Sequence, residues 1–403
     1  MATGLLMQAL TLLSGAITAR LLGVEGRGAF TACTVLPGLV LTLGNLGGPI
    51  SLTYFSAILP KQTSRLTKQA MITGLVLGLV LSGILASLYP LFLHNYPDLI
   101  IAAIVPACIV LPLQLMSSQI NAVTQGTGNL IQFNIVRLLG PLTYFLALAS
   151  LYIFKIDSIR IILWAPAAGA VAVFVAVMVL RKPLNSTPVH WESVRTTYGY
   201  GLKAHLGNIT ALDSLRVDLV LIIAFLSSRD AGLYAVAIAV ASVVRSQAST
   251  IGYVAVPTIA RQPDLASSLR YARIFFLGTL VLIVSMTAVL LPLLKSALGL
   301  VYGTDFAEAS GITSVLLIAM IFASLRQSLG DISRGLGFPG LGSVAEIASW
   351  VSAAVLLPIL ITSHGLMGAA VAVLVAYFSA LLVTIMLLSR RGVPVRTLIL
   401  KPE

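Results

Sequence analysis

Charge is scarce in this chain. Only 9% of its 403 residues are charged, whereas 58% are hydrophobic, and the mean hydropathy is +1.01. A soluble domain cannot bury that much apolar surface, so lipid is the solvent for most of the chain. The apolar runs are long and unbroken, which excludes a β-barrel with its short alternating spans. The sequence therefore predicts an all-α polytopic membrane protein.

Cysteines and catalytic motifs are also sparse. Cys33 and Cys108 both lie in apolar runs and define neither a disulfide framework nor a metal site. We find no phosphate-binding glycine loop, no HxxxH or CxxC pair and no DxD-type acidic cluster. The histidines are scattered: His94, His190, His205 and His364. We therefore expect no enzyme, no metal and no cofactor.

The net charge of +12 does not indicate nucleic acid, because the basic residues lie mainly between the apolar runs, where they set topology. A span needs about 20 apolar residues, which predicts about twelve transmembrane helices and no cleavable signal peptide. The expected spans are 2–22, 28–58, 69–92, 98–123, 130–154, 161–180, 201–226, 231–259, 272–294, 310–333, 341–363 and 366–389.

Lysine and arginine concentrate in alternate connections, which predicts that both termini are cytoplasmic. The longest connection, from Arg181 to Gly201, divides the chain into two sets of six spans. We expect an N-terminal six-helix lobe at 1–180, a cytoplasmic linker at 181–200, a C-terminal six-helix lobe at 201–390 and a cytoplasmic tail at 391–403. Weak similarity between the halves, with Gly28 aligned to Gly232, suggests two parallel repeats.

Four arginines fall inside expected spans: Arg137, Arg216, Arg245 and Arg326. A charge at the bilayer midplane costs about 2.5–3.5 kcal/mol, so such residues either pair or serve a function. Arg245 shares a helical face with small polar residues, and Asp213 lies at a similar depth. Two interpretations remain open. Arg245 pairs with Asp213, or Asp213 pairs with Arg216 three residues along the helix and Arg245 is available to an anion.

The remaining polar residues of the spans are weaker candidates. Arg326 has small residues on its face, and Arg137 either snorkels or lines a cavity. Asp218 and Glu346 are candidates for ion pairing or ion coupling, although Glu346 reads first as an acid at a membrane boundary. Asp331 and Arg334 are expected to be solvated near the cytoplasmic end. Interhelical hydrogen bonding explains most uncharged polar residues, which are Gln8, Asn45, Gln114, Gln119, Asn121, Asn208 and Gln247.

Four stretches carry a resemblance to a known family. They are "ITARLLGVEGRGAF" (Ile17–Phe30), "SSRDAGLYAVA" (Ser227–Ala237), "LVYGTDFAEAS" (Leu300–Ser310) and "RGLGFPGLG" (Arg334–Gly342). Together and in this order they resemble Wzx-type polysaccharide flippases of the MATE-like MOP exporter superfamily, over essentially the whole chain. Lipid II flippases of that group carry cavity arginines in their second span, where this chain has Val40 and Leu41. This departure disfavours a lipid II flippase.

The resemblance implies two six-helix lobes around a central cavity. It also implies a flippase that moves a polyprenyl-pyrophosphate-linked oligosaccharide from the inner to the outer leaflet of the cell membrane by alternating access. The product would feed cell-surface polysaccharide such as the O-antigen of lipopolysaccharide, with a polysaccharide polymerase as a possible partner. Arg245, Arg326, Arg216 and Arg137 are then the expected substrate contacts.

Three alternatives remain. A MATE-type cation-coupled drug exporter would favour acids over arginines in its cavity, and a membrane-embedded polymerase or ligase would need a large outside loop. The third alternative is a scramblase or membrane scaffold.

Overall fold

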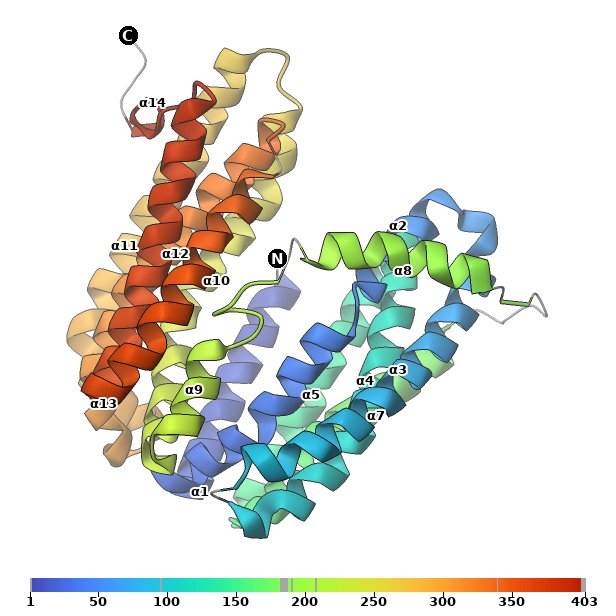
Figure 1. The fold of residues 1–403 in the computed structure, drawn as a ribbon, viewed down its shortest axis with the longest axis vertical. Helices are drawn as coiled ribbons and strands as arrows, with labels where there is room; N and C mark the ends of the chain where they lie inside the picture. The colour runs from blue at the N-terminus through green and yellow to red at the C-terminus, as the bar shows by residue number, and fades with distance from the viewer. Residues whose placement is uncertain are drawn as a thin grey trace. The chain divides into compact units, whose positions relative to one another are not determined.

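The computed structural model describes residues 2–94, 96–181, 188–189, 191–206, 209–338 and 340–399. His190, Asn208 and residues 182–187 of the expected linker at 181–200 lie outside these residues. The described residues form helices and no strand, which confirms the all-α fold class (Figure 1). The chain divides into two units, Met1–Ile209 with Ser214–Arg216, and Thr210–Asp213 with Val217–Glu403.

Nine stretches of the described chain are long and apolar enough to cross a membrane. Two of them, α1 (Ala2–Gly44) and α13 (Leu341–Arg390), contain 43 and 50 residues. At 1.5 Å per residue each is about twice as long as a bilayer core of about 30 Å is thick. Each is broken at a glycine with positive φ, Gly23 at 67° and Gly365 at 56°. These breaks lie between the spans expected at 2–22 and 28–58 and at 341–363 and 366–389, so each helix accounts for two expected spans.

The first unit is built around α4 (Ile100–Gly126). This helix packs against α1, α3, α5 and α7, and also against α2. The other helices of the unit are α2 (Gly48–Ile58), α3 (Thr63–Phe92), α5 (Leu130–Ile153), α6 (Ile159–Ile162), α7 (Ala165–Leu180) and α8 (Trp191–Leu206), with short 3-10 turns at Pro60–Gln62 and Pro97–Leu99.

Prolines inside these spans leave carbonyl groups that other helices satisfy. Pro112 has no N–H for the carbonyl of Cys108, and the Ser82 hydroxyl donates to that carbonyl instead at 3.1 Å. Pro37 likewise leaves the carbonyl of Cys33, which accepts from the buried Tyr89 hydroxyl at 2.8 Å. Both hydroxyls come from α3. Because lipid offers no donor, these two bonds let α1 and α4 contain prolines at membrane depth.

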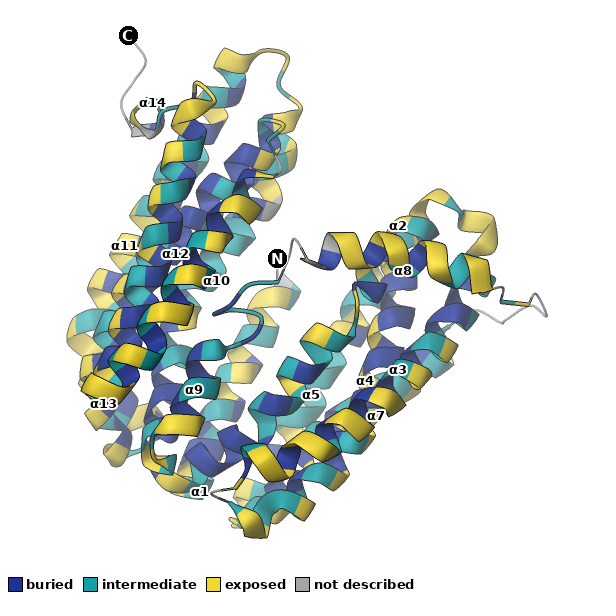
Figure 2. Cartoon of the chain, in the orientation of Figure 1, coloured by how far each residue is buried: buried dark blue, intermediate teal, exposed yellow. Residues whose placement is uncertain are grey.

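Helix α8 lies across the ends of α3 and α4 beside α2 (Figure 1). One side of it is buried and the opposite side is exposed (Figure 2). The buried side is tied to the spans by polar contacts. The Tyr198 hydroxyl donates to Gln119 at 3.1 Å, and the Ser193 hydroxyl donates to Gln69 at 3.2 Å. Burial raises the pKa of the Tyr198 phenol, so this donor keeps its proton at neutral pH.

The second unit is built around α12 (Ser310–Gly335), which packs against α10 (Ser228–Ala260), α11 (Leu265–Tyr302) and α13. It also contains α9 (Val217–Phe225), a 3-10 turn at Thr304–Ala309 and α14 (Val395–Ile399). The capping box of α10 joins the side chains and backbone of Ser227 and Asp230 at its N-terminus. Asp264 caps α11 by accepting from the backbone of Ser267 at 2.7 Å.

The span expected at 201–226 is not one continuous helix, so that prediction was wrong. Its described residues form the end of α8 and the whole of α9, and 209–216 lie outside regular helix. Arg216 has a φ of 51°, a left-handed conformation that interrupts a helix. The expected span at 28–58 is also interrupted, because Leu46 and Gly47 have φ values of 49° and 71° between α1 and α2.

Candidate functional site

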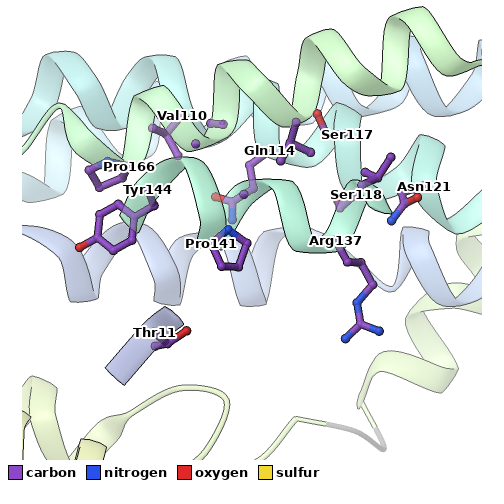
Figure 3. Close-up of a pocket in the computed structure, with 15 residues that line it drawn as sticks. Thr11, Val110, Gln114, Ser117, Ser118, Asn121, Arg137, Pro141, Tyr144 and Pro166 are labelled. Atoms are coloured by element: carbon purple, nitrogen blue, oxygen red, sulfur yellow. The ribbon is translucent and has the colours of Figure 1, made fainter. Parts of the chain in front are cut away.

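A cavity of about 470 Å³ lies within the first unit. The residues that line it come from α1, α4, α5 and α7, and the polar ones among them are Thr11, Gln114, Ser117, Ser118, Asn121, Arg137 and Tyr144. Figure 3 shows Arg137, Ser118 and Asn121 at one end, Tyr144 and Pro166 at the other, and Gln114 between them. The wall of this cavity is mainly apolar, and the polar side chains on it can bind the polar groups of a ligand.

Helix α4 supplies most of the polar side chains. Gln114, Ser117, Ser118 and Asn121 are spaced at i, i+3, i+4 and i+7, so they form one stripe along the helix. Two of them, Ser117 and Ser118, donate to backbone carbonyls one turn earlier. The sequence interpretation assigned the amides to interhelical hydrogen bonds and missed this stripe. The helical spacing was the signal that could have found it.

Arg137 is the only charged residue among those that line the cavity. Its guanidinium lies over the Phe133 ring, 5.2 Å from the centroid, an arrangement that orients the group without neutralising its charge. Pro141, one turn along α5, has no N–H for the carbonyl of Arg137, and both residues line the cavity. This end of the cavity therefore offers a cation together with a carbonyl that has lost its helical donor.

Glycines let α5 and α7 pack closely beside the cavity. A side chain at Gly169 would begin 3.1 Å from the carbonyl oxygen of Gly140 and 3.6 Å from the Cβ atom of Tyr144. Glycine at 169 therefore allows α7 to approach α5, and a larger residue would force the two helices apart.

The second unit holds a different arrangement of charges. Arg245 on α10 forms an ion pair with Asp213, which lies in the non-helical segment before α9. The same carboxylate oxygen accepts a hydrogen bond from the Tyr377 hydroxyl of α13 at 2.6 Å. The Arg245 guanidinium lies 5.8 Å from the centroid of the Tyr377 ring. Asp213 is therefore held by two partners from two helices.

A second ion pair of this unit is more deeply buried than that of Arg245 and Asp213. Arg326 on α12 contacts Glu346 on α13 at 3.0 Å, and their side chains are only 10% and 9% exposed. Glu346 is also within electrostatic range of Asp213 and Arg245. The four side chains therefore form one buried cluster with two charges of each sign. Glu346 is buried within its unit with Arg326 beside it, so its side chain forms an ion pair.

Two further acids of the second unit are buried with partners. Asp218 accepts from the Tyr234 hydroxyl at 2.8 Å. Asp331 is buried and pairs with Arg334, whose side chain is about half exposed. The expectation that Asp331 is solvated was therefore wrong, because α12 is the central helix of its unit and that face of it is covered.

Comparison with protein families decides the identity of the chain at the level of family. A sequence profile described as polysaccharide biosynthesis protein matches residues 17–310. The chain belongs to this family. The matched region includes every lining residue of the first-unit cavity except Thr11.

Solved structures show the fold of this polysaccharide biosynthesis protein. An inward-facing MATE-family multidrug resistance transporter of the MOP superfamily aligns with a TM-score of 0.77 at 12% identity, over 96% of this chain and 94% of its own. The lipid II flippase MurJ in an inward closed conformation also gives 0.77, at 13% identity, over 98% and 88%. A MOP superfamily transporter from Pyrococcus furiosus gives 0.59 at 12% identity, over 96% and 93%. The comparison with curated proteins found no match.

The four candidate arginines of this family member lie in three different surroundings. Arg245 and Arg326 lie in the second unit and face carboxylates. Arg137 lies in the first-unit cavity. Arg216 lies in the segment before α9, where the backbone is not helical, so the helical i, i+3 relation to Asp213 does not hold. The sequence interpretation missed Tyr377 and Tyr144, because a lone tyrosine in a span carries no pattern that identifies its partner.

Proposed function

We propose that this polysaccharide biosynthesis protein is a flippase that moves a polyprenyl-pyrophosphate-linked oligosaccharide from the inner to the outer leaflet by alternating access. The first-unit cavity with its single arginine carries the proposal. A sugar pyrophosphate cannot cross hydrocarbon unaided, because its charges and hydroxyls would lose water without replacement. The Gln114 and Asn121 amides of α4 suit sugar hydroxyls, and Arg137 suits a phosphate oxygen.

The paired arginines have a conditional role in this proposal. Arg245 and Arg326 contact the pyrophosphate only in a state in which Asp213 and Glu346 have released them. Breaking a buried pair without a replacement partner costs several kcal/mol, about 3–5. An incoming phosphate replaces the carboxylate and lowers that cost. Arg216, in the turn beside Asp213, is the fourth proposed contact.

Energy for outward movement can come from the membrane potential. Moving about two negative charges outward across an inside-negative membrane is favoured by about 2.3 kcal/mol per charge per 100 mV. In this proposal the protein lies in the inner or plasma membrane with both termini cytoplasmic. The flipped product then becomes the substrate of a polysaccharide polymerase at the outer surface.

The test uses purified protein in liposomes that contain a polyprenyl-pyrophosphate oligosaccharide, with a membrane-impermeant glycan-cleaving enzyme outside. We expect Arg137→Ala to reduce the initial rate of flipping by about 10²-fold, as for loss of a charge-assisted contact of about 3 kcal/mol. Arg137→Lys should retain part of the rate because it keeps the charge. Arg270→Ala is the matched control, since Arg270 is an exposed arginine at the start of α11.

A wild-type protein that does not move this substrate would contradict the proposal. The alternative of a cation-coupled drug exporter is favoured by the acids of the second unit, of which Asp218 and Glu346 are buried and Asp213 is partly buried. The same liposomes therefore receive a lipophilic fluorescent cation and a pH or sodium gradient. Gradient-driven movement of the cation, without movement of the lipid-linked oligosaccharide, would support the exporter instead.

A further inference from the structure

A second cavity, of about 190 Å³, adjoins the first one within the same unit. The two cavities share Val110, Gln114 and Pro166 as lining residues. The second cavity extends from these residues toward α1 and α3, where it is lined by Cys33, Pro37, Leu41 and Tyr89. A ligand that occupies both cavities would contact Gln114 in each of them.

Apart from the Gln114 amide, which it shares with the first cavity, the second cavity is apolar in effect, although it contains two hydroxyl groups. The Tyr89 hydroxyl donates to the carbonyl of Cys33 at 2.8 Å, and the Thr34 hydroxyl donates to the carbonyl of Phe30 at 2.9 Å. Both donors are thus engaged with backbone. The rest of the lining is mainly proline, alanine, leucine and valine. Such a lining stabilises a hydrocarbon group and gives no partner to a sugar.

Helix α4 makes the change from apolar to polar along a single stripe. Ala103, Pro106, Ala107 and Val110 precede Gln114, Ser117, Ser118 and Asn121 at helical spacing. The distance along the helix from Ala107 to Asn121 is about 21 Å at 1.5 Å per residue. One face of α4 therefore suits a ligand that is apolar at one end and polar at the other.

We infer that the second cavity binds an isoprene unit of the prenyl chain while the pyrophosphate lies toward Arg137. This inference rests on the proposed function and names a subsite for the lipid part of the substrate. The volume fits, because a cavity of about 150 Å³ binds benzene and a five-carbon isoprene unit is of similar size. The arrangement uses the apolar lining to select a prenyl phosphate over a soluble sugar phosphate.

The experiment fills the cavity with Ala107→Phe. Ala107 is buried and lines the second cavity only. Val105→Phe is the matched control, because Val105 lies two residues away on the same helix and is exposed on the outside of the unit. Binding of two probes, geranylgeranyl pyrophosphate and inorganic pyrophosphate, is measured on the full-length protein in nanodiscs. Arg137→Ala is measured in parallel.

We expect Ala107→Phe to weaken geranylgeranyl pyrophosphate about tenfold or more, since loss of only two buried carbons is worth that factor. Binding of inorganic pyrophosphate should not change, and Val105→Phe should bind both probes normally. Arg137→Ala should weaken both probes. Equal binding of geranylgeranyl pyrophosphate by Ala107→Phe and wild type, with Arg137→Ala still defective, would overturn the subsite and leave the proposed function intact. Indifference of both probes to Arg137→Ala would instead count against the proposed function.

Photolabelling gives a second readout that does not depend on a folded variant. A geranylgeranyl pyrophosphate that carries a diazirine on an isoprene unit of its chain is irradiated on the wild-type protein, and the labelled residues are identified by mass spectrometry. Labels within Cys33–Leu41, or at the cavity-lining residues Ala103, Pro106, Ala107 and Val110, are the expected result. Labels confined to lipid-facing positions such as Val105, or labels that excess unlabelled probe does not reduce, would overturn the inference.

Discussion

The two units use arginine in opposite ways. In the first unit, Arg137 lines a cavity in which no other lining residue is charged. In the second unit, Arg245 and Arg326 lie against Asp213 and Glu346 inside a buried cluster. An arginine that faces a carboxylate in low dielectric is already satisfied and stabilises its surroundings, whereas one without an acid beside it attracts an anion. The same residue type at membrane depth therefore does not indicate the same role.

The largest expected effect tests whether the pair of Arg326 and Glu346 stabilises the fold. Glu346→Ala leaves Arg326 buried without its carboxylate and should lower the free energy of unfolding by about 3–5 kcal/mol. Thermal and denaturant unfolding in detergent micelles measures the loss. Glu308→Ala is the control, because Glu308 pairs with Arg229 at 2.6 Å but both side chains are well exposed, and such a pair is worth about 0–1 kcal/mol.

Removing both charges of the pair of Arg326 and Glu346 separates the effect of an unpaired charge from that of lost packing. Arg326→Met combined with Glu346→Met should recover most of the stability that Glu346→Ala loses, because no unpaired charge remains. If the double variant were as unstable as Glu346→Ala, the loss would come from packing and the contrast between the units would not rest on charge.

The next largest effect comes from replacing an arginine by alanine in each unit and comparing the loss of unfolding free energy. Arg245→Ala leaves Asp213 without its ion partner, and since both side chains are 20% exposed we expect a loss of about 2–3 kcal/mol in unfolding free energy. Arg137→Ala should change stability by about 0.5 kcal/mol or less while it impairs flipping. Unfolding curves and the liposome rate are measured on both variants. Equal destabilisation by the two variants would remove the distinction drawn between them.

A smaller effect is expected at Tyr377, which donates a hydrogen bond to Asp213. Tyr377→Phe removes one donor to Asp213 but leaves the ion pair with Arg245, so we expect a loss of about 1 kcal/mol. The reference is Tyr271→Phe, which alters an exposed tyrosine of α11. A double-mutant cycle with Arg245→Ala reports how strongly the two partners of Asp213 are coupled. A coupling energy of zero would mean that Asp213 does not link them.

The smallest effect is at an acid outside the spans. Hydrogen bonds from the backbone and hydroxyl of Ser267 lower the pKa of Asp264 below its ordinary value of 3.8. A lowered folded-state pKa stabilises the fold above the unfolded value, and this contribution is lost as the pH falls through the folded-state pKa. Asp264→Ala should therefore lower the midpoint of thermal unfolding slightly at pH 6 and progressively less below pH 3.8. A difference that stays constant over this pH range would show that the carboxylate charge is not involved.

Sequence reasoning was most successful where structure is local. The apolar runs predicted most spans, and the glycine breaks of α1 and α13 at Gly23 and Gly365 lie between predicted spans. It failed at 201–226, because the hydropathy of that stretch does not reveal that Asp213 is bound from α10 and α13. Those tertiary contacts stabilise a backbone course that local propensity would not select.

The site shows the same division. The pair of Arg245 and Asp213 was one of two interpretations open from depth alone, and only the structure brings these side chains together. Arg326 and Glu346 are on successive helices, but helical spacing within each cannot say which faces meet. The polar stripe of α4 was readable from spacing, yet helix packing decides which residues of α1, α5 and α7 line the cavity beside it.

The sequence by itself determined that lipid is the solvent, that helices are the structure and that a few charges lie at membrane depth. These follow from composition and from backbone hydrogen bonds that close within four residues. Only the tertiary structure decided which arginines have a carboxylate partner and which one lines a cavity. The reason is physical: the energy of a buried charge depends on its lateral neighbours, and neighbours on other helices are set by packing.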